Sequence, residues 1–487
     1  MLDAATDDAV HIYKSSNIQR FVDGTWSANN LVDNVWGHYY EGIRAANFYL
    51  KETAGLTFDE WKYSDDYEAI MKEFTNYQYE VRFLRAYFYF ELIKRYRNIP
   101  FVLDVLAQNE ANGVNPESYE KIAKFIVDEC SDLAQILPVN YDNFSTKEKG
   151  RVTRAAAMAL KSRVTLYMAS PLFSEDSEDK WKQAAEAAYD IIKQKTDLGL
   201  DLVPYPQIFN DVNNQKAEVI LYRPTGESGD FEKANFPIGV EGGKTSTCPT
   251  QNLMEAYDMK DGTPFVWNNQ SNPYDNRDPR MKYTIVCNEM KWPVDPVEIW
   301  EGGTNGLPLQ NATTTGYYLK KYVNNTISFE AGSTVTKKQH NWVLFRYGEI
   351  LLNYAEAMIN AFHDPNYKDA VYNMSAREAV NQIRGRTNIS LPGFPSDITE
   401  KDFVKRLKNE RRVELAFEGH RFWDVRRWKE LGQTANIYGV KITKNNEVIS
   451  YEKFLLETRA VTDNMYFYPI PNTERFKNPN LGQNPGW

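Results

Sequence analysis

The sequence predicts a mainly α-helical protein, built on a scaffold of helical hairpins with a loop-rich irregular insert in the middle. Three observations support this fold class. Apolar residues recur at helical spacing over most of the first 200 residues, and the same spacing returns after residue 342. Between these parts, residues 203–347 hold 11 of the 26 glycines and 11 of the 22 prolines, and the helical spacing fades.

The first clear helix is predicted over residues 80–97, and it is expected to stop at Asn98 and Pro100. A second helix is predicted over residues 151–169, where four alanines make it slim enough for a neighbour to approach closely. Another helix is expected from about Lys180, and it completes a hairpin with the preceding one.

A further helical hairpin is predicted late in the chain, over residues 342–361 and 375–386. Both hairpins carry small residues in the seam between their helices and resemble tetratricopeptide units, in which about 34 residues form one helix pair. Unrelated antiparallel helix pairs are the alternative, because the repeat is imperfect. The insert between the hairpins is rich in Trp and Tyr, which disfavour disorder, so an ordered loop-rich region is expected there.

Composition argues against several classes of function. The net charge of −9 and the pI of about 5.4 disfavour nucleic acid as a partner, since binding to it needs a basic surface. No stretch of 18 apolar residues is present, so no membrane span is expected, and the N-terminus shows no signal sequence. The three cysteines, Cys130, Cys248 and Cys287, form no CxxC pair and are expected to be buried as small hydrophobic residues.

The sequence lacks motifs for metal or cofactor chemistry. Its five histidines are scattered without an HExxH motif, and neither a P-loop nor a GxGxxG motif is present, so neither a metal site nor a cofactor is expected. A glycosidase needs two carboxylates about 5–9 Å apart. Glu414 and Glu418 lie one helical turn apart, but Arg411, Arg412 and Arg421 surround them in sequence. Guanidinium neighbours lower the pKa of a carboxyl, whereas a general acid needs a raised one, so ion pairs are favoured over catalysis.

Residues 409–432 combine eleven charged residues with four aromatic ones. On a helix, Arg411, Glu414 and Glu418 share one stripe, and Gly419 then interrupts the helical spacing. The pattern predicts two helical turns that meet at a corner, where buried Arg–Glu pairs formed by these residues fill a polar seam that aromatic side chains seal. The segment is therefore interpreted as structural rather than catalytic.

The segment ERRVELAFEGHRFWDVRRW (410–428) strongly resembles the C-terminal signature of the SusD/RagB family of surface nutrient-binding lipoproteins. Other segments agree with that family in the order in which it shows them. These segments are RFLRAYFYFELIKRYRNIP (82–100), GRVTRAAAMALKSRVTLYMASP (150–171), PTQNLMEAYDMKDG (249–262), NRDPRM (276–281), FRYGEILLNYAEAMI (345–359) and the tail from YPIPNTE to NPNLGQNPGW (468–487).

The resemblance implies a single domain over residues 1–487, with an N-terminal helical part (1–202), a loop-rich insert (203–341) and a C-terminal helical part with a closing tail (342–487). It implies a lipid-anchored protein at the cell surface, outside a Gram-negative outer membrane, with a SusC-like TonB-dependent transporter as its partner. The lipobox cysteine is absent from this chain, which is consistent with a trimmed start. Arg97 stands where the family usually has Gly in a turn.

The function expected from these features is that of a non-catalytic binding protein, which captures oligosaccharides or similar nutrients and delivers them to the transporter. Many aromatic residues without a convincing acid–base pair suit binding better than catalysis. The alternatives, from other classes, are a carbohydrate-active hydrolase and a tetratricopeptide-like protein-docking scaffold.

Candidate ligand contacts follow from the chemistry of sugars, which present flat C–H faces and a rim of hydroxyls. Exposed aromatic rings cover the faces, while amide and charged side chains bond the hydroxyls. Aromatic residues in loops beside such side chains are therefore the candidates, although each of them could instead fold back as a packing residue. They are Trp26 and Trp61 in the N-terminal part, and Trp267, Asn269, Tyr274, Trp292 and Trp300 in the insert.

Overall fold

The computed structural model describes residues 2–144, 148, 150–175, 177–209, 217–268, 272–292, 294–330 and 336–487. The chain forms two compact units, each built from two separate stretches of sequence. Unit 1 comprises Met1–Thr25 and Asp201–Val461, and unit 2 comprises Trp26–Leu200 and Thr462–Trp487. The fold is mainly α-helical with small two-stranded sheets, so the predicted fold class is confirmed. The division of a single domain into parts at residues 202 and 341 stays a prediction.

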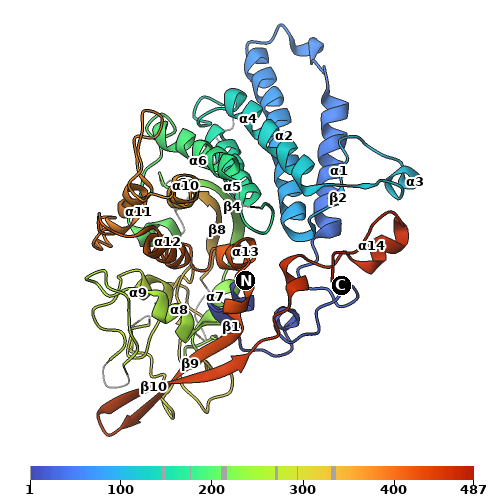
Figure 1. Cartoon of the computed structure of the whole chain (residues 1–487). Helices are drawn as coiled ribbons and strands as arrows, with labels where there is room; N and C mark the ends of the chain where they lie inside the picture. The colour runs from blue at the N-terminus through green and yellow to red at the C-terminus, as the bar shows by residue number, and fades with distance from the viewer. Residues whose placement is uncertain are drawn as a thin grey trace. The chain divides into compact units, whose positions relative to one another are not determined.

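Unit 2 is a series of helices that pack on one another in chain order (Figure 1). The elements of this unit are α1 (Trp36–Thr53), α2 (Tyr67–Tyr96), α3 (Gln108–Ala111), α4 (Tyr119–Ile136), α5 (Arg154–Ala169), α6 (Glu178–Lys193), α14 (Asn472–Lys477), β2 (Ile99–Pro100) and β3 (Pro116–Glu117). α1 packs on α2, α2 on α4, α4 on α5, and α5 on α6. The alanines of α5 are buried, so α4 and α6 can both approach this helix closely. This agrees with the prediction that four alanines make the helix slim.

α2 is longer than the predicted helix over residues 80–97. The turns that precede residue 80 bury Glu73 and Asn76 rather than apolar residues, so hydrophobic spacing does not reveal them, and Glu80 is buried at the start of the predicted part. Arg151 pairs with Glu73 and Glu80, which satisfies these buried carboxylates. α2 ends where expected, and Arg97 then adopts a φ of 66°, a left-handed conformation that glycine takes without strain.

Unit 1 contains the insert and the late helices. Its helices are α7 (Asp230–Asn235), α8 (Gln251–Ala256), α9 (Met281–Thr284), α10 (Tyr347–Phe362), α11 (Ala376–Arg384), α12 (Glu400–Glu414) and α13 (His420–Arg427). Its strands are β1 (Ala9–His11), β4 (Val219–Ser228), β5 (Thr247–Pro249), β6 (Ile285–Val286), β7 (Tyr318–Leu319), β8 (Lys338–Arg346), β9 (Asn436–Asn445) and β10 (Val448–Thr458).

The described residues of the insert share a hydrophobic core with the start of the chain and with residues from α12 to β10. β4 pairs with β8 in antiparallel register, and β8 continues directly into α10, which packs on α11 and α12. Tyr257, Tyr317 and Tyr318 are fully buried in this core, so much of the aromatic excess of the sequence fills the interior. β1 pairs with β5, which places the first residues of the chain in this unit as well.

The predicted corner is present between α12 and α13. α12 ends at Glu414, and the chain then turns through Phe417 and Gly419, whose φ angles are 60° and 78°. Phe422 and Trp423 of α13 are buried within unit 1. Glycine at the second of these positions adopts the positive φ without strain, so the chain can change direction sharply between the two helices.

Candidate functional site

Trp61 keeps an accessible ring surface. It ends a short 3-10 turn in the loop between α1 and α2, and it is 50% exposed. Its indole stacks on Phe58 with ring centroids 5.4 Å apart, and Phe58 meets Phe74 of α2 edge to face at 5.0 Å. Tyr63, two residues further along, is 88% exposed. The loop is therefore anchored by Phe58, while the exposed half of the indole can stack on a ligand.

Two aromatic candidates of the insert are partly exposed. Trp267 meets Phe265 edge to face, with ring centroids 6.4 Å apart. Lys444 of β9 lies over the ring of Trp300, with its Nζ 4.5 Å from the ring centre. Both tryptophans pack against the core of unit 1 with part of their surface and leave the rest accessible. They belong to unit 1, whereas Trp61 belongs to unit 2.

Trp26 and Trp292 are packing residues, contrary to the role expected of them. They are 4% and 3% exposed. Trp26 is enclosed edge to face by Tyr468 and Trp487, and Trp292 meets Phe236 in the same way. Because aromatic side chains gain most from full burial, these loop residues fold back into the interior, and no ring face is left for stacking on a sugar.

Tyr274 is also used mainly for packing. Its ring meets those of Tyr317 and Tyr451 at 6.2 and 5.3 Å, and its hydroxyl is shielded from solvent. Burial raises the pKa of this hydroxyl well above its usual value of 10.0. Asn269, the amide expected to accompany Trp267, lies outside the described residues.

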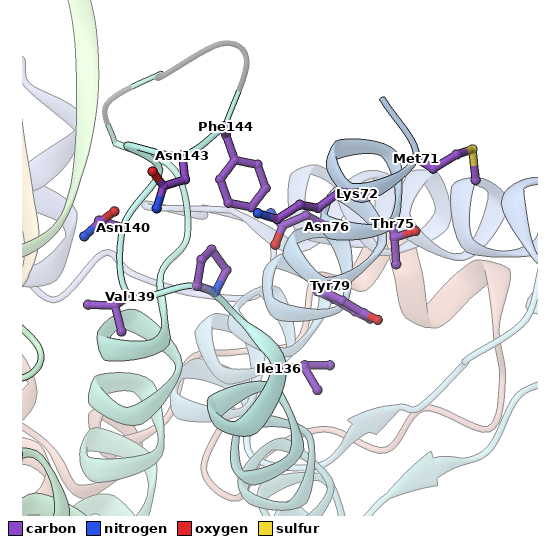
Figure 2. A pocket seen from close by; sticks show the side chains of 11 residues that line it. Met71, Lys72, Thr75, Asn76, Tyr79, Ile136, Val139, Asn140, Asn143 and Phe144 are labelled. Carbon is purple, nitrogen blue, oxygen red and sulfur yellow. The ribbon is translucent and has the colours of Figure 1, made fainter. Parts of the chain in front are cut away.

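A cavity of about 570 Å³ opens between α2 and the segment that follows α4 (Figure 2). We call it the α2–α4 cavity. Its lining combines amide, hydroxyl, aromatic and aliphatic side chains. The lining residues are Met71, Lys72, Thr75, Asn76 and Tyr79 of α2, together with Ile136, Pro138, Val139, Asn140, Asn143 and Phe144.

Hydrogen bonds and a ring contact hold the wall of this cavity in place. The amide of Asn76 donates to Glu80 Oε1 and to the hydroxyl of Tyr141, both at 2.8 Å. Lys72 and Phe144 turn toward each other in Figure 2, and the Lys72 Nζ lies 4.6 Å from the ring centre. Both side chains belong to the lining, so a ligand there would meet a cation, an aromatic ring and several amides.

The chemistry of the α2–α4 cavity suits binding. No Asp, Glu or His is among the described residues that line it. The cavity therefore offers hydrogen-bond donors and acceptors, but no pair of carboxyl groups of the kind that hydrolysis of a glycosidic bond needs.

The sequence reasoning did not identify this cavity. One of its walls does show the pattern by which the ligand contacts in the insert were predicted, namely loop aromatic residues beside amide side chains. The segment PVNYDNF (138–144) places two exposed asparagines beside aromatic residues. That pattern could have singled out the segment. The other wall lies within α2, where Thr75 and Tyr79 carry no such signal.

A larger cavity of about 830 Å³ lies along α12 in unit 1. Phe265, the ring neighbour of Trp267, forms part of one wall. Many of the charged side chains in this groove are already paired within the protein. Arg412, for example, donates to Asp8 Oδ1 at 2.6 Å. The groove is a second candidate surface, adjacent to one of the partly exposed tryptophans.

The carboxyl pair weighed as catalytic is buried among cations. Glu414 is 0% exposed and accepts hydrogen bonds from Arg280, Arg346 and Arg386 at 2.7–2.8 Å. Burial by itself raises the pKa of a carboxyl, but these three arginines hold the pKa of Glu414 well below its usual 4.5. Glu418 accepts from Arg346 Nε at 2.7 Å, and its pKa is lowered as well. Neither residue can serve as a general acid near neutral pH.

Arg411 is buried and paired, but its partner is not Glu414. Its Nε donates to Asp424 Oδ2 and its Nη1 to Asn353 Oδ1, both at 2.8 Å. The expected pairing between Arg411 and Glu414 is therefore wrong. The two side chains belong to the same helix but meet different elements, so each finds its partner through tertiary packing.

The described part of the chain holds no group of three or more His, Cys, Asp or Glu side chains arranged to bind a metal ion. Cys130, Cys248 and Cys287 are buried and free, and burial raises the pKa of each thiol. None of the helices that the structure describes is both long and apolar enough to cross a membrane.

Comparisons with known proteins agree over the whole chain. The curated SusD-like protein P2 of Formosa agariphila is 23% identical over 481 residues, which cover 94% of this chain and 81% of that protein. A solved SusD-like protein from Bacteroides fragilis is 26% identical with a TM-score of 0.81, covering 100% of this chain and 93% of its own. A second solved protein from Bacteroides fragilis, described as a SusD-like carbohydrate binding protein, is 25% identical with a TM-score of 0.80, covering 99% and 92%.

Family models account for both parts of the sequence. A model described as "Starch-binding associating with outer membrane" matches residues 1–166. The model of the SusD family matches residues 208–487, which is more than half of the chain and includes the segment at 410–428. The chain therefore belongs to the SusD/RagB family.

Proposed function

We propose that the protein binds saccharides at the outer surface of a bacterial outer membrane and passes them to a TonB-dependent transporter. The observation that carries this proposal is the family membership of the chain, together with its full-length likeness to a solved SusD-like carbohydrate binding protein. Residues 1–166 match a family model described as starch-binding and associating with the outer membrane. That description supports a saccharide as the ligand and the outer membrane as the location.

The accessible side chains support a saccharide ligand. Trp61 offers an indole surface, and the α2–α4 cavity offers the amides of Asn140 and Asn143 beside an aromatic ring. Trp267 and Trp300 provide further ring surface in unit 1. Ring faces cover the C–H faces of a sugar, and amides bond its hydroxyls, so these groups are the proposed contacts.

Binding without turnover is the proposed mode of action. The lining of the α2–α4 cavity supports it, because the described residues there include no carboxyl group. The buried, ion-paired state of Glu414 supports it as well, since a carboxylate held ionised by three arginines cannot donate a proton. A carbohydrate-active hydrolase is the competing function.

A glycan panel followed by calorimetry tests the proposal. The parent protein is expected to bind at least one glycan and to leave it chemically unchanged, as judged by chromatography after prolonged incubation. Trp61→Ala and Asn140→Ala should each weaken that binding at least tenfold, since truncating a true contact costs about 2 kcal/mol or more. Phe476→Ala is the matched control, because Phe476 is an 85% exposed aromatic residue of unit 2 outside the cavity.

The outcomes separate the three functions. Formation of a shorter glycan would establish a hydrolase and contradict the proposal. Absence of binding across the panel would favour a protein-docking scaffold. If glycan binds, but Trp61→Ala, Asn140→Ala and the same substitution at Trp267 and Trp300 all bind like the parent, the ligand surface lies elsewhere.

The transporter and the membrane anchor are tested separately. The proposed partner is a SusC-like TonB-dependent transporter, and the proposed anchor is a lipid on a cysteine upstream of this chain. Full-length protein tagged in its native host should then co-purify with an outer-membrane barrel protein and carry a lipid detectable by mass spectrometry. Recovery of unlipidated full-length protein from the cytoplasm would contradict both proposals.

A further inference from the structure

A pocket of about 290 Å³ lies between α4, α5 and α6 in unit 2, apart from the α2–α4 cavity. Each helix contributes one face to it. Arg154 and Lys161 come from α5, seven residues apart and thus two turns along the same side of the helix. Alanines at 134 and 187 keep the walls short on the neighbouring helices, which leaves room between the three helices. We call this space the α4–α6 pocket.

The α4–α6 pocket carries an excess of positive charge. Among the residues that the structure describes, neither Arg154 nor Lys161 forms an ion pair. The acidic residue in the lining is Asp190, and it is already bound to Lys193, with a distance of 2.5 Å between Oδ1 and Nζ. The two cations of α5 therefore face the pocket without a counterion from the surrounding helices.

One nitrogen of the half-buried Arg154 side chain is left without a hydrogen bond among the described residues. Its Nε is shielded from solvent and has no acceptor within the described structure. Leaving a buried donor of a charged group unsatisfied costs free energy, so proteins seldom do so without a bound partner. An acceptor that enters the pocket would remove this cost.

The position of Arg154 on α5 adds to the positive potential. It is the first residue of the helix, where the backbone N–H groups give the helix end a partial positive charge. Acidic residues usually occupy the first turn for this reason, yet the first turn of α5 contains none, and the N-cap Thr153 makes no side-chain cap. The backbone N–H of Arg154 itself donates to the carbonyl oxygen of Pro138, so at this end of the 16-residue helix the arginine side chain is the group left to bind an anion.

Neutral side chains complete the lining. Gln135 of α4 is exposed at the rim and can donate to a ligand, and Met158 of α5 provides an apolar surface next to the cations. Guanidinium and ammonium groups beside an amide are the donors that bind carboxylate and sulfate oxygens. A neutral ligand would leave the charge of Arg154 and Lys161 uncompensated.

We propose that the α4–α6 pocket binds a carboxylate or sulfate group, carried by an acidic sugar, through Arg154 and Lys161. That the group is carried by a sugar rests on the proposed function. That the pocket takes an oxyanion rests on its unpaired cations and on the unsatisfied Arg154 Nε. The α4–α6 pocket thus adds a pair of cations on one helix to the aromatic rings, amides and single lysine of the α2–α4 cavity.

Galacturonate and galactose are suitable probes, because they differ only in the carboxylate or hydroxymethyl group at C6. Their binding to the whole chain is measured by calorimetry at constant ionic strength, with sodium sulfate as a third probe. Galacturonate should bind at least tenfold more tightly than galactose, and sulfate should compete with it. The double variant with Arg154→Gln and Lys161→Gln should lose that preference.

Lys124→Gln is the matched control, since Lys124 is a lysine of α4 paired with Asp128 on the exposed side of the helix. It should keep the parent's preference. Circular dichroism checks the fold, and Lys161→Gln alone replaces the double variant if that variant does not fold. The inference is overturned if galacturonate binds no better than galactose, if the variants keep the preference, or if sulfate neither binds nor competes.

The same experiment distinguishes the two proposals. A glycan that binds the parent and the variants equally, with no effect of charge, overturns the oxyanion site and leaves saccharide binding intact. Binding of sulfate that depends on Arg154 and Lys161, with no glycan bound from the panel, supports the oxyanion site and contradicts the proposed function.

Discussion

Replacing Glu356 by Gln tests how strongly the buried ion pairs stabilise unit 1. Glu356 lies on α10 and is 4% exposed. Its Oε2 accepts from Arg427 Nη2 and its Oε1 from Trp428 Nε1, both at 2.7 Å, which ties α10 to α13 and to the residue after it. Gln has almost the same size and shape, so the substitution removes the charge with little change in packing.

The expected magnitude follows from the pKa of this carboxyl. Burial by itself raises the pKa, but the charge and hydrogen bonds of Arg427 and the hydrogen bond of Trp428 lower it from 4.5 to about 2. One pKa unit corresponds to about 1.4 kcal/mol, so ionised Glu356 stabilises the folded state by about 3 kcal/mol at neutral pH. Unfolding entropy is about 2 cal/mol/K per residue, so this loss should lower the Tm of a unit of about 290 residues by about 5 °C.

Differential scanning calorimetry of the parent and Glu356→Gln at pH 7, 5, 4 and 3 provides the test. Because the pKa of the folded state is depressed, the stabilisation is complete above pH 4.5 and is lost as the pH falls toward 2. The difference in Tm should therefore be about 5 °C at pH 7 and should shrink at pH 3. Glu447→Gln, whose side chain is 95% exposed, is the control and should change Tm by less than about 1 °C.

Two results would refute this reasoning. One is a Tm for Glu356→Gln within 1 °C of the parent at pH 7. The other is a difference in Tm that stays the same from pH 7 to pH 3, since the lost stability would then not come from the ionised carboxylate.

The remaining predictions concern strain, a buried ammonium group and a packing residue. Arg97→Gly should be about 1 kcal/mol more stable than Arg97→Ala in urea unfolding, because Ala keeps the Cβ that disfavours a φ of 66°; equal stabilities would show that the turn is unstrained. Burial lowers the pKa of Lys321 from 10.5 to about 8, an effect that Glu418 only partly offsets. Between pH 8 and pH 10.5 the unfolded state therefore binds more protons than the folded state, so the stability of the parent should rise with pH, and Lys321→Met should remove that rise. Trp26→Ala should cost about 3–5 kcal/mol in the same assay, whereas Trp61→Ala should cost under about 1 kcal/mol; similar losses would contradict their assigned burial.

Local patterns predicted the helices whose buried faces are apolar. α5 and α10 follow this rule, because most of their buried residues are apolar or small, although α10 also buries Glu349, Asn353 and Glu356. The N-terminal half of α2 breaks it, since Glu73, Asn76 and Glu80 occupy the buried face. Those turns are stable because Arg151 arrives from a distant segment, which no window of local sequence contains.

The β9–β10 ribbon lies in a part of the chain that was expected to be helical. Its strands pair in antiparallel register, and Asn446 has a φ of 55° in the turn between them. The segment KITKNNEVIS carried a recognisable signal, because β-branched residues flank an Asn-Asn pair that tolerates a positive φ. Hydrophobic spacing alone was the wrong criterion there.

The sequence by itself determined the mainly helical fold class, the corner between α12 and α13 and the family, because repeated apolar spacing and characteristic segments are local properties of the chain. Only the tertiary structure decided which aromatic rings stay accessible. Trp26 and Trp61 occupy similar loops in sequence, yet Trp26 is enclosed by rings from the C-terminal tail and Trp61 is not. The tertiary structure also decided the partners of Arg411 and Glu414, and it left the Nε of Arg154 without an acceptor among the described residues. The physical reason is that burial and charge pairing depend on which distant segments meet, and helical periodicity specifies only the face that a residue occupies on its own element.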